Sequence, residues 1–170
     1  MTAEQKKVAM GAASGVASMI FLVWLFYVLL PAIPGMDVFP ARLALALQMN
    51  VLAVLPLFIG FITVGNGRFL SDAIDPTQHK ESRTLEINGR FVDNTLQQNF
   101  IFFIGTTALS LFLTEATAKL LVSLAIVFVI ARVIFWIGYR MNPLYRAPGM
   151  AATGYMNLGI LVSVVYLMFT

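Results

Sequence analysis

The chain alternates between five long apolar stretches and shorter polar segments. The first stretch, Val8–Leu30, contains no charged residue and exceeds the roughly 20 residues that a helix needs to cross the hydrocarbon core of a bilayer. Four further apolar stretches follow at Arg42–Gly65, Phe91–Leu113, Leu120–Tyr139 and Met150–Thr170. We therefore predict an all-α integral membrane protein with five spanning helices.

Composition supports this class and excludes several others. Of the 170 residues, 59% are hydrophobic and 11% charged, and the mean hydropathy is +0.86, which is outside the range of ordinary soluble domains. Cysteine is absent, which excludes disulfides, protein thiolate nucleophiles and cysteine-based metal sites. The only histidine, His79, lies in a charged segment and is interpreted as solvated, so we expect no metal site. No basic run with interleaved aromatic residues indicates nucleic-acid binding.

The first apolar stretch predicts an uncleaved helix. Lys6 and Lys7 precede it as in a signal peptide, but a signal peptide has an apolar core of only about 7–15 residues. Gly11 and Gly15 form a GxxxG pair, which allows close packing of helices in a membrane. We divide the chain at the proline-rich turn into an N-terminal helix with its turn, residues 1–40, and a body of four helices, residues 41–170.

The basic residues predict an orientation. With five spans, most of them lie on one side, in three segments: Lys6 and Lys7 at the N-terminus, Arg68, Lys80 and Arg83 in the second connection, and Arg140 and Arg146 in the fourth. Basic segments favour the cytoplasm. The sequence thus predicts a cytoplasmic N-terminus and a C-terminus on the far side.

A polar stripe marks the start of the third stretch. Arg90, Asn94, Gln97 and Gln98 recur at the spacing of one helix face, with Asp93 at its edge. Polar side chains in a membrane helix are costly unless they face the bundle interior or a wet cavity, which favours a site. Interhelical hydrogen bonding is the alternative, and it is the interpretation that we prefer for Gln48 and Asn50 in the second stretch.

The fourth stretch carries a second polar face at the same predicted depth. Arg132, Phe135 and Tyr139 share one side of that helix, Arg146 follows in the next turn, and Arg68 lies just beyond the second stretch. Together these residues predict a cationic pocket at the edge of the bilayer for a small, flexible, multiply anionic ligand, because guanidinium groups bind carboxylates in bidentate fashion. Simpler interpretations remain open: Arg132 neutralises Asp93, Arg140 is a positive-inside anchor, and Trp136, Tyr139 and Tyr145 form an interfacial aromatic belt.

The order and spacing of these residues resemble a known family. The pattern Arg90-x3-Asn94-x2-Gln97, followed by Ala131-Arg132-x2-Phe135-x2-Gly138-Tyr139 and then Arg146, resembles the membrane-associated proteins in eicosanoid and glutathione metabolism (MAPEG) across residues 41–170. The segment 138–149 looks like the bacterial branch, which implies a bacterial inner membrane. The resemblance implies a four-helix bundle that assembles as a homotrimer, here with one additional N-terminal transmembrane helix.

The resemblance also implies a function and a site. Family enzymes bind glutathione as co-substrate between subunits near the cytoplasmic face, and an arginine stabilises its thiolate for attack on lipophilic electrophiles or lipid hydroperoxides that arrive through the membrane lipids. The glutathione-contact positions would be Arg90, Asn94, Gln97, Gln98, Arg132, Phe135 and Tyr139. The thiolate-stabilising role falls on Arg146, with Arg68 as the alternative.

Three departures from the family pattern keep another function open. Gln97 stands where glutathione-binding members usually carry glutamate, Gln98 and Phe135 stand where some members have tyrosine, and Val8–Leu30 is additional. The alternative is therefore a non-catalytic membrane protein of the same fold that binds lipids or partner proteins. A small transporter is a weaker interpretation, because we find no clear symmetric repeat or broken central helix.

Overall fold

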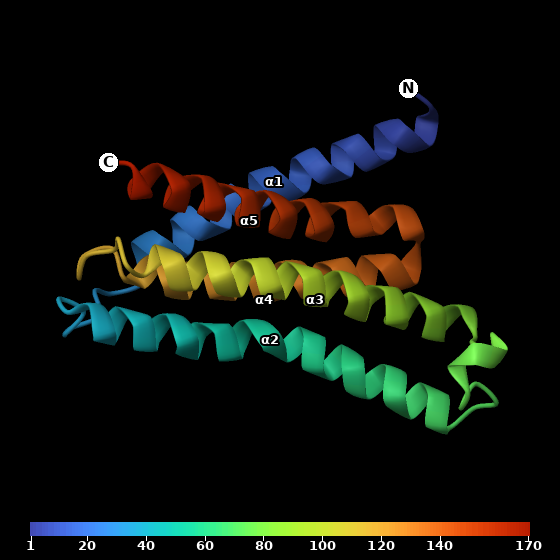
Figure 1. Cartoon of the computed structure of the whole chain (residues 1–170). Coiled ribbons are helices and arrows are strands. Elements are labelled where there is room, and N and C mark those ends of the chain that lie inside the picture. The colour runs from blue at the N-terminus through green and yellow to red at the C-terminus, as the bar shows by residue number, and fades with distance from the viewer.

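The computed structural model describes all residues, 1–170, and it is entirely helical (Figure 1). Its five α-helices are α1 (Ala3–Leu29), α2 (Phe39–Phe69), α3 (Arg83–Leu109), α4 (Lys119–Met141) and α5 (Ala147–Met168), with short 3-10 helices η1 (Pro76–Gln78) and η2 (Pro143–Arg146) in the connections. The prediction of an all-α protein is confirmed. Each apolar stretch corresponds to one helix, although α3 ends at Leu109, four residues before the predicted end of its stretch at Leu113.

Four of the five helices are long and apolar enough to cross a membrane, namely α1, α2, α4 and the segment Pro143–Met168 that contains α5. The third helix is not among them, because Asp93, Asn94, Gln97, Gln98 and Asn99 lie within its most apolar part. It also begins eight residues earlier than the apolar stretch predicts. Ser82 caps this extension by accepting a hydrogen bond from the Leu85 amide at 3.3 Å, and Glu86 lies in the first turn. Five spans therefore stay a prediction.

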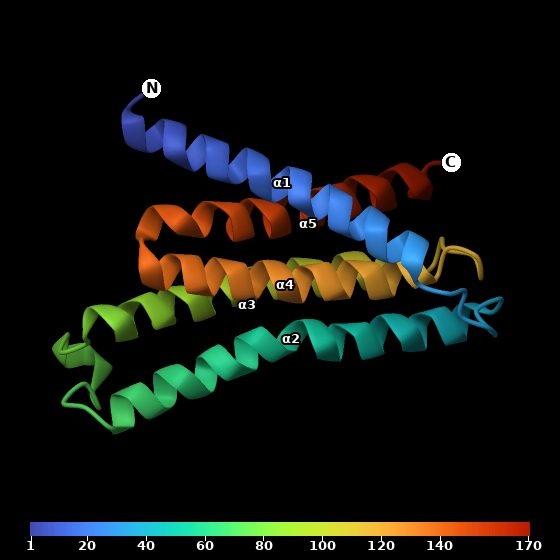
Figure 2. The ribbon, with the colours of Figure 1, turned by 180° about the vertical axis from the view of Figure 1, so that it is seen from behind.

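The helices α2 to α5 lie side by side, and α1 crosses α5 on the outside of this group (Figures 1 and 2). Their shared core contains Phe102 of α3 packed against Phe128 of α4, with ring centroids 4.4 Å apart and the rings tilted by 35°. It also contains the fully buried Ala46 and Ala53 of α2. Small residues at such positions let helices approach closely. The helix α2 bends near its middle, where the sequence predicts a kink at Pro56.

The N-terminal helix α1 packs on its own chain. A Cβ atom at Gly15 would lie 2.1 Å from the carbonyl oxygen of Pro148, and one at Gly11 would lie 3.3 Å from the Cβ of Ala147. The prediction that the GxxxG pair supports close packing is therefore confirmed, and the contact is with the start of α5. Apart from Gly15 and Met19, the side chains of α1 are not fully buried.

The N-terminus, the α2–α3 connection and the α4–α5 turn lie at one end of the bundle (Figure 1), which we call the basic end. The three basic segments of the sequence share this end, as the five-span pattern requires. The C-terminus lies at the opposite end, which we call the far end. The side of the membrane that each end faces stays a prediction.

Two basic side chains hold the far end together. Buried Arg42 donates through Nη1 to the carbonyl oxygens of Met36 and Asp37, at 2.9 and 2.8 Å, and through Nε to Ser110 O at 3.3 Å. Lys119 Nζ donates to Leu30 O at 3.0 Å. In the sequence Arg42 begins the second apolar stretch and Lys119 immediately precedes the fourth, and neither position indicates these partners. Their bonds satisfy carbonyl groups that helix ends and turns leave without partners.

The two amides of the second stretch differ in environment. Asn50 Nδ2 donates to Thr106 Oγ1 of α3 at 2.9 Å, so its predicted role as an interhelical hydrogen-bond donor is confirmed. Gln48 is exposed and makes no hydrogen bond within the chain, so the same prediction does not hold for it here.

We expect Gly15→Ala to lower the free energy of unfolding by about 1–3 kcal/mol, because the new methyl group forces α1 away from the Pro148 backbone. Thermal unfolding in detergent, followed by circular dichroism, measures this change. The matched control is Gly159→Ala in α5, where a Cβ meets no atom within 4 Å and the change stays within about 1 kcal/mol. Equal stability of the two variants would contradict the close contact.

Candidate functional site

The polar stripe of α3 faces a cavity of about 260 Å³ at the basic end, which we call the polar cavity. Its lining comes from three elements and the turn between two of them: Arg90, Asp93, Asn94 and Gln97 of α3, Phe135 and Tyr139 of α4, Arg146 of η2 and Met150 of α5. The structure thus brings six of the nine predicted site residues to one cavity within a single chain.

Arg132 lies beneath this cavity and is fully buried. Its Nη1 donates to Asn94 Oδ1 at 2.9 Å, and its Nη2 donates to Gly149 O at 3.1 Å and to Thr153 Oγ1. The guanidinium carbon also lies 4.6 Å from the ring centroid of Phe135, within the range of a cation–π contact. Arg132 therefore joins α3, α4 and α5 through neutral groups.

The guanidinium of Arg132 has no acidic partner. The ion pairs of the chain are Arg68–Glu81 and Arg90–Glu86, so the interpretation that Arg132 neutralises Asp93 is wrong. Its Nε is buried without a hydrogen-bond acceptor. A buried cation without a counter-charge is costly, and an anion bound nearby reduces that cost.

Two glycines allow α5 and η2 to sit on α4. A Cβ at Gly149 would lie 2.4 Å from Ala131 O, and a Cβ at Gly138 would lie 2.3 Å from Tyr145 O. These close approaches place Arg146 above the ring of Tyr139, with the guanidinium carbon 4.9 Å from the ring centroid. Arg146 is partly buried and forms no ion pair, so its charge faces the polar cavity uncompensated.

The other cation at the rim is Arg90. Its side chain is exposed and pairs with Glu86 one turn earlier, with Nη2 and Oε1 2.8 Å apart. The hydrogen bond and the negative charge of Glu86 raise the pKa of Arg90, which keeps it cationic. Exposed pairs of this kind are weak, so a ligand can compete with Glu86 for the guanidinium.

Gln98 turns away from the polar cavity. Asn157 of α5 donates through Nδ2 to both Gln98 Oε1, at 2.9 Å, and the Gln98 carbonyl, at 3.0 Å. Sequence reasoning missed Asn157, although an asparagine inside an apolar stretch is a signal of interhelical bonding. For Gln98 the hydrogen-bonding interpretation of the stripe is therefore the one that the structure supports.

A second, largely apolar groove of about 510 Å³ lies beside the first, between α1 and the beginning of α5. Val8 and Ala12 line it from α1, and Gln98 and Arg146 supply polar groups at its wall. We call it the apolar groove. Arg146 and Met150 line both this groove and the polar cavity.

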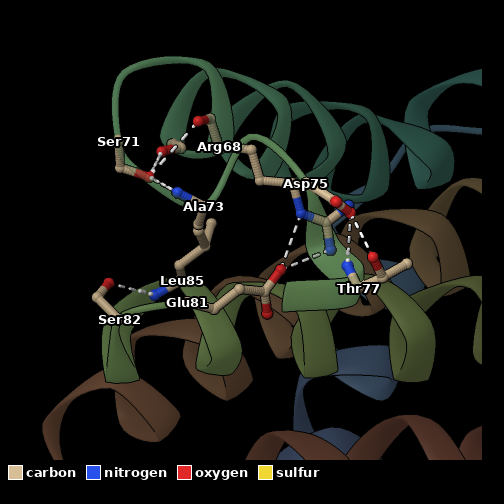
Figure 3. Close-up of polar contacts among 9 residues, drawn as sticks. Arg68, Ser71, Ala73, Asp75, Thr77, Glu81, Ser82 and Leu85 are labelled. Atoms are coloured by element: carbon tan, nitrogen blue, oxygen red, sulfur yellow. Dashed lines mark hydrogen bonds and ion pairs between the residues drawn. The ribbon is translucent and has the colours of Figure 1, made fainter. Parts of the chain in front are cut away.

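Arg68 lies outside both cavities in this chain. It belongs to the last turn of α2, and its Nη2 pairs with Glu81 Oε1 at 2.7 Å (Figure 3). The connection that supplies Glu81 is ordered by Asp75, whose Oδ1 accepts from the Thr77 amide at 2.9 Å. The alternative role of Arg68 in stabilising a thiolate stays a prediction.

Residues 42–166, which include all of the polar cavity, match the model of the MAPEG family. The chain belongs to the MAPEG family. The matched region begins at the first turn of α2, so α1 lies outside it. No solved structure gives a significant match.

Two mammalian proteins are similar to this MAPEG chain along most of its length. Transmembrane protein 79 of Mus musculus is 30% identical over 161 residues, which cover 92% of this chain and 41% of the relative. Transmembrane protein 79 of Bos taurus is 28% identical over 161 residues, covering 93% of this chain and 40% of the relative. This chain therefore spans about two fifths of these relatives. The predicted bacterial branch stays a prediction.

We expect Asn94→Ala to lower the free energy of unfolding by about 1–3 kcal/mol, because it leaves Nη1 of buried Arg132 without an acceptor. Asn94→Asp keeps the acceptor and adds a counter-charge, so its stability stays at or above that of the original chain. Thermal unfolding in detergent measures both. Asn66→Ala, at an exposed position of α2, serves as control and changes little. Equal losses in the alanine and aspartate variants would contradict this role of Asn94.

Proposed function

We propose that this MAPEG protein is a glutathione-dependent transferase or peroxidase that acts on lipophilic electrophiles or lipid hydroperoxides. One observation carries the proposal: Arg146, a cation without an acidic partner, lines both the polar cavity and the apolar groove. A reaction between a water-soluble thiol and a lipophilic substrate needs a polar site and an apolar site that meet at the reacting atoms, and Arg146 lies where the two cavities meet.

The chemistry of the polar cavity supports a small anionic peptide as one substrate. Glutathione has two carboxylates and two amide bonds. Guanidinium groups bind carboxylates, and the side-chain amides of Asn94 and Gln97 donate to and accept from peptide groups. The uncompensated charge of buried Arg132 beneath the cavity adds to its attraction for anions.

Arg146 is the residue that we assign to the thiol. An ordinary thiol has a pKa near 8.5 and is a weak nucleophile at neutral pH until a nearby cation favours the thiolate. The thiolate sulfur then attacks the electrophilic carbon of the second substrate, and the carbon–sulfur bond forms as a leaving group departs with its electron pair or as the electrons of an activated double bond shift to a neighbouring atom that solvent protonates. With a lipid hydroperoxide the thiolate attacks the terminal oxygen, the O–O bond breaks to release the alcohol, and a second glutathione converts the resulting sulfenic acid to glutathione disulfide and water. The tail of that substrate occupies the apolar groove, which Val8 and Ala12 of α1 help to build.

The family's assembly and the orientation of the chain complete the proposal. We propose a homotrimer with the N-terminus in the cytoplasm, so that glutathione reaches the basic end from the cytosol. The three basic segments at this end support that orientation. Asp93 and Gln97 are exposed in the single chain, which leaves their side of the cavity accessible to a neighbouring subunit.

A non-catalytic protein that binds lipids or partner proteins is the second candidate. Two residues of the polar cavity favour it. Phe135 supplies no hydroxyl group and Gln97 supplies no carboxylate, so both positions offer a glutathione molecule fewer polar contacts than tyrosine and glutamate would. This candidate predicts binding without dependence on a thiol. Robust conjugation of glutathione would rule it out.

We expect Arg146→Ala to lower kcat/KM for glutathione conjugation by about ten- to a hundredfold, because the thiol loses the cation that favours its ionised form. The pH profile moves as well. In the original protein activity rises with pH through a thiol pKa held below about 8.5, and in the variant that rise shifts up toward about 8.5.

Arg140→Ala is the control, because Arg140 is an exposed cation of the same region that lines neither cavity. Calorimetric titration of glutathione into the purified protein accompanies the kinetics, and Arg90→Ala and Arg146→Ala should weaken binding. Unchanged turnover and pH profile in Arg146→Ala would reject Arg146 as the thiolate-stabilising residue. Failure of the original protein to bind millimolar glutathione would reject the proposed activity.

The apolar groove gives a separate prediction. Gly154 lines it, and a Cβ at this position meets no atom within 4 Å, so Gly154→Phe fills the groove without a clash at the backbone. We expect kcat/KM for a long-chain electrophile to fall by about tenfold or more, while a small water-soluble electrophile reacts at the original rate. Gly65→Phe in α2, which is equally unobstructed, leaves both rates unchanged. Equal effects on the two electrophiles would contradict the assignment of the groove.

A further inference from the structure

The polar cavity contains two opposite charges that do not neutralise each other. Asp93 and Arg146 both line it, and neither forms an ion pair with any residue of the chain. Their charged atoms are therefore more than 4.0 Å apart, although they share a cavity of about 260 Å³. The remaining cation of the lining, Arg90, is already paired with Glu86.

The carboxylate of Asp93 also lacks hydrogen bonds within the chain. Its neighbours in the lining are the amides of Asn94 and Gln97, of which Asn94 is engaged with Arg132. Gln97 lies one helical turn beyond Asp93 on the same helix and carries no charge. Asp93 is thus the one acidic group that the cavity presents to a ligand.

Charge complementarity then fixes the ligand class. A cavity with cations alone selects anions, whereas separated unpaired charges of both signs select a molecule with an ammonium group and an anionic group at some distance from each other. Bringing the two ends of one ligand to two separated charges also fixes its orientation. The anionic end or thiolate lies toward Arg146 and the ammonium toward the α3 wall.

We infer that Asp93 binds the ammonium group of the ligand and makes the polar cavity selective for zwitterions over purely anionic molecules. This inference rests on the proposed function, in which the ligand is glutathione, and it assigns to Asp93 the amino group of the γ-glutamyl residue. Asp93 is then a specificity-determining residue, distinct in role from the thiolate-stabilising Arg146.

The test compares two ligands on the full-length protein in detergent. One is glutathione, and the other is glutaryl-cysteinylglycine, in which hydrogen replaces the amino group while both carboxylates and the thiol remain. We expect the original protein to bind glutathione about tenfold more tightly, since a hydrogen bond between charged groups contributes on that order. Asp93→Asn should weaken glutathione binding about tenfold and leave binding of the glutaryl peptide unchanged or improved.

Two further variants make the test specific. Gln97→Glu, added to Asp93→Asn, returns a carboxylate to the same wall and should restore the preference for glutathione. Asp72→Asn removes an exposed acidic group outside the cavity and should leave the preference unchanged. Helical content and elution volume establish that each variant is folded.

The outcomes separate this inference from the proposed function. If the original protein binds both peptides equally, or if Asp93→Asn weakens both by the same factor, the inference is overturned while glutathione binding stands. If the original protein binds neither peptide, the proposed function fails and the inference fails with it. A preference for glutathione that is lost in Asp93→Asn and regained with Gln97→Glu supports both.

Discussion

The buried guanidinium of Arg132 is the interaction on which the rest of the site depends. Its Nη1 and Nη2 atoms donate to an amide on α3 and to a carbonyl and a hydroxyl on α5, and its plane lies against an aromatic ring of its own helix, all of them neutral partners. These partners fix the relative positions of three helices at the depth where the cavity begins. They also leave the charge of Arg132 uncompensated, so the element that holds the helices together is also a source of positive potential beneath the ligand.

Helical periodicity explains which parts of this arrangement were predictable. A residue advances about 100° around a helix, so Arg90, Asn94 and Gln97 return to nearly the same direction, as do Arg132 and Tyr139. Gln98 lies about 80° from Arg90 by the same rule, and that offset is sufficient for it to face Asn157 on α5 instead of the cavity. The helical spacing therefore predicted correctly that Arg90, Asn94 and Gln97 face one cavity, but it did not predict that Gln98 faces α5.

Residues whose partners lie in connections could not be placed from the sequence. Arg68 pairs with Glu81, and Arg42 bonds to carbonyl groups of Met36 and Asp37, because the conformations of these segments bring the partners within reach. No periodicity relates such residues to one another. Likewise, the sequence predicted close packing at Gly11 and Gly15, but the identity of the partner, the Pro148 backbone, depends on the crossing of α1 over α5.

The two ends of the helix bundle differ in how accessible their cationic side chains are, because Arg42 is buried and Lys119 partly buried at the far end. Both of these side chains donate hydrogen bonds to backbone carbonyl groups, and these bonds help to join the ends of the helices. At the basic end, Arg146 has no such partner and faces a cavity. Accessible cationic side chains consequently gather at the basic end, so the chain offers anions one preferred direction of approach without any moving part.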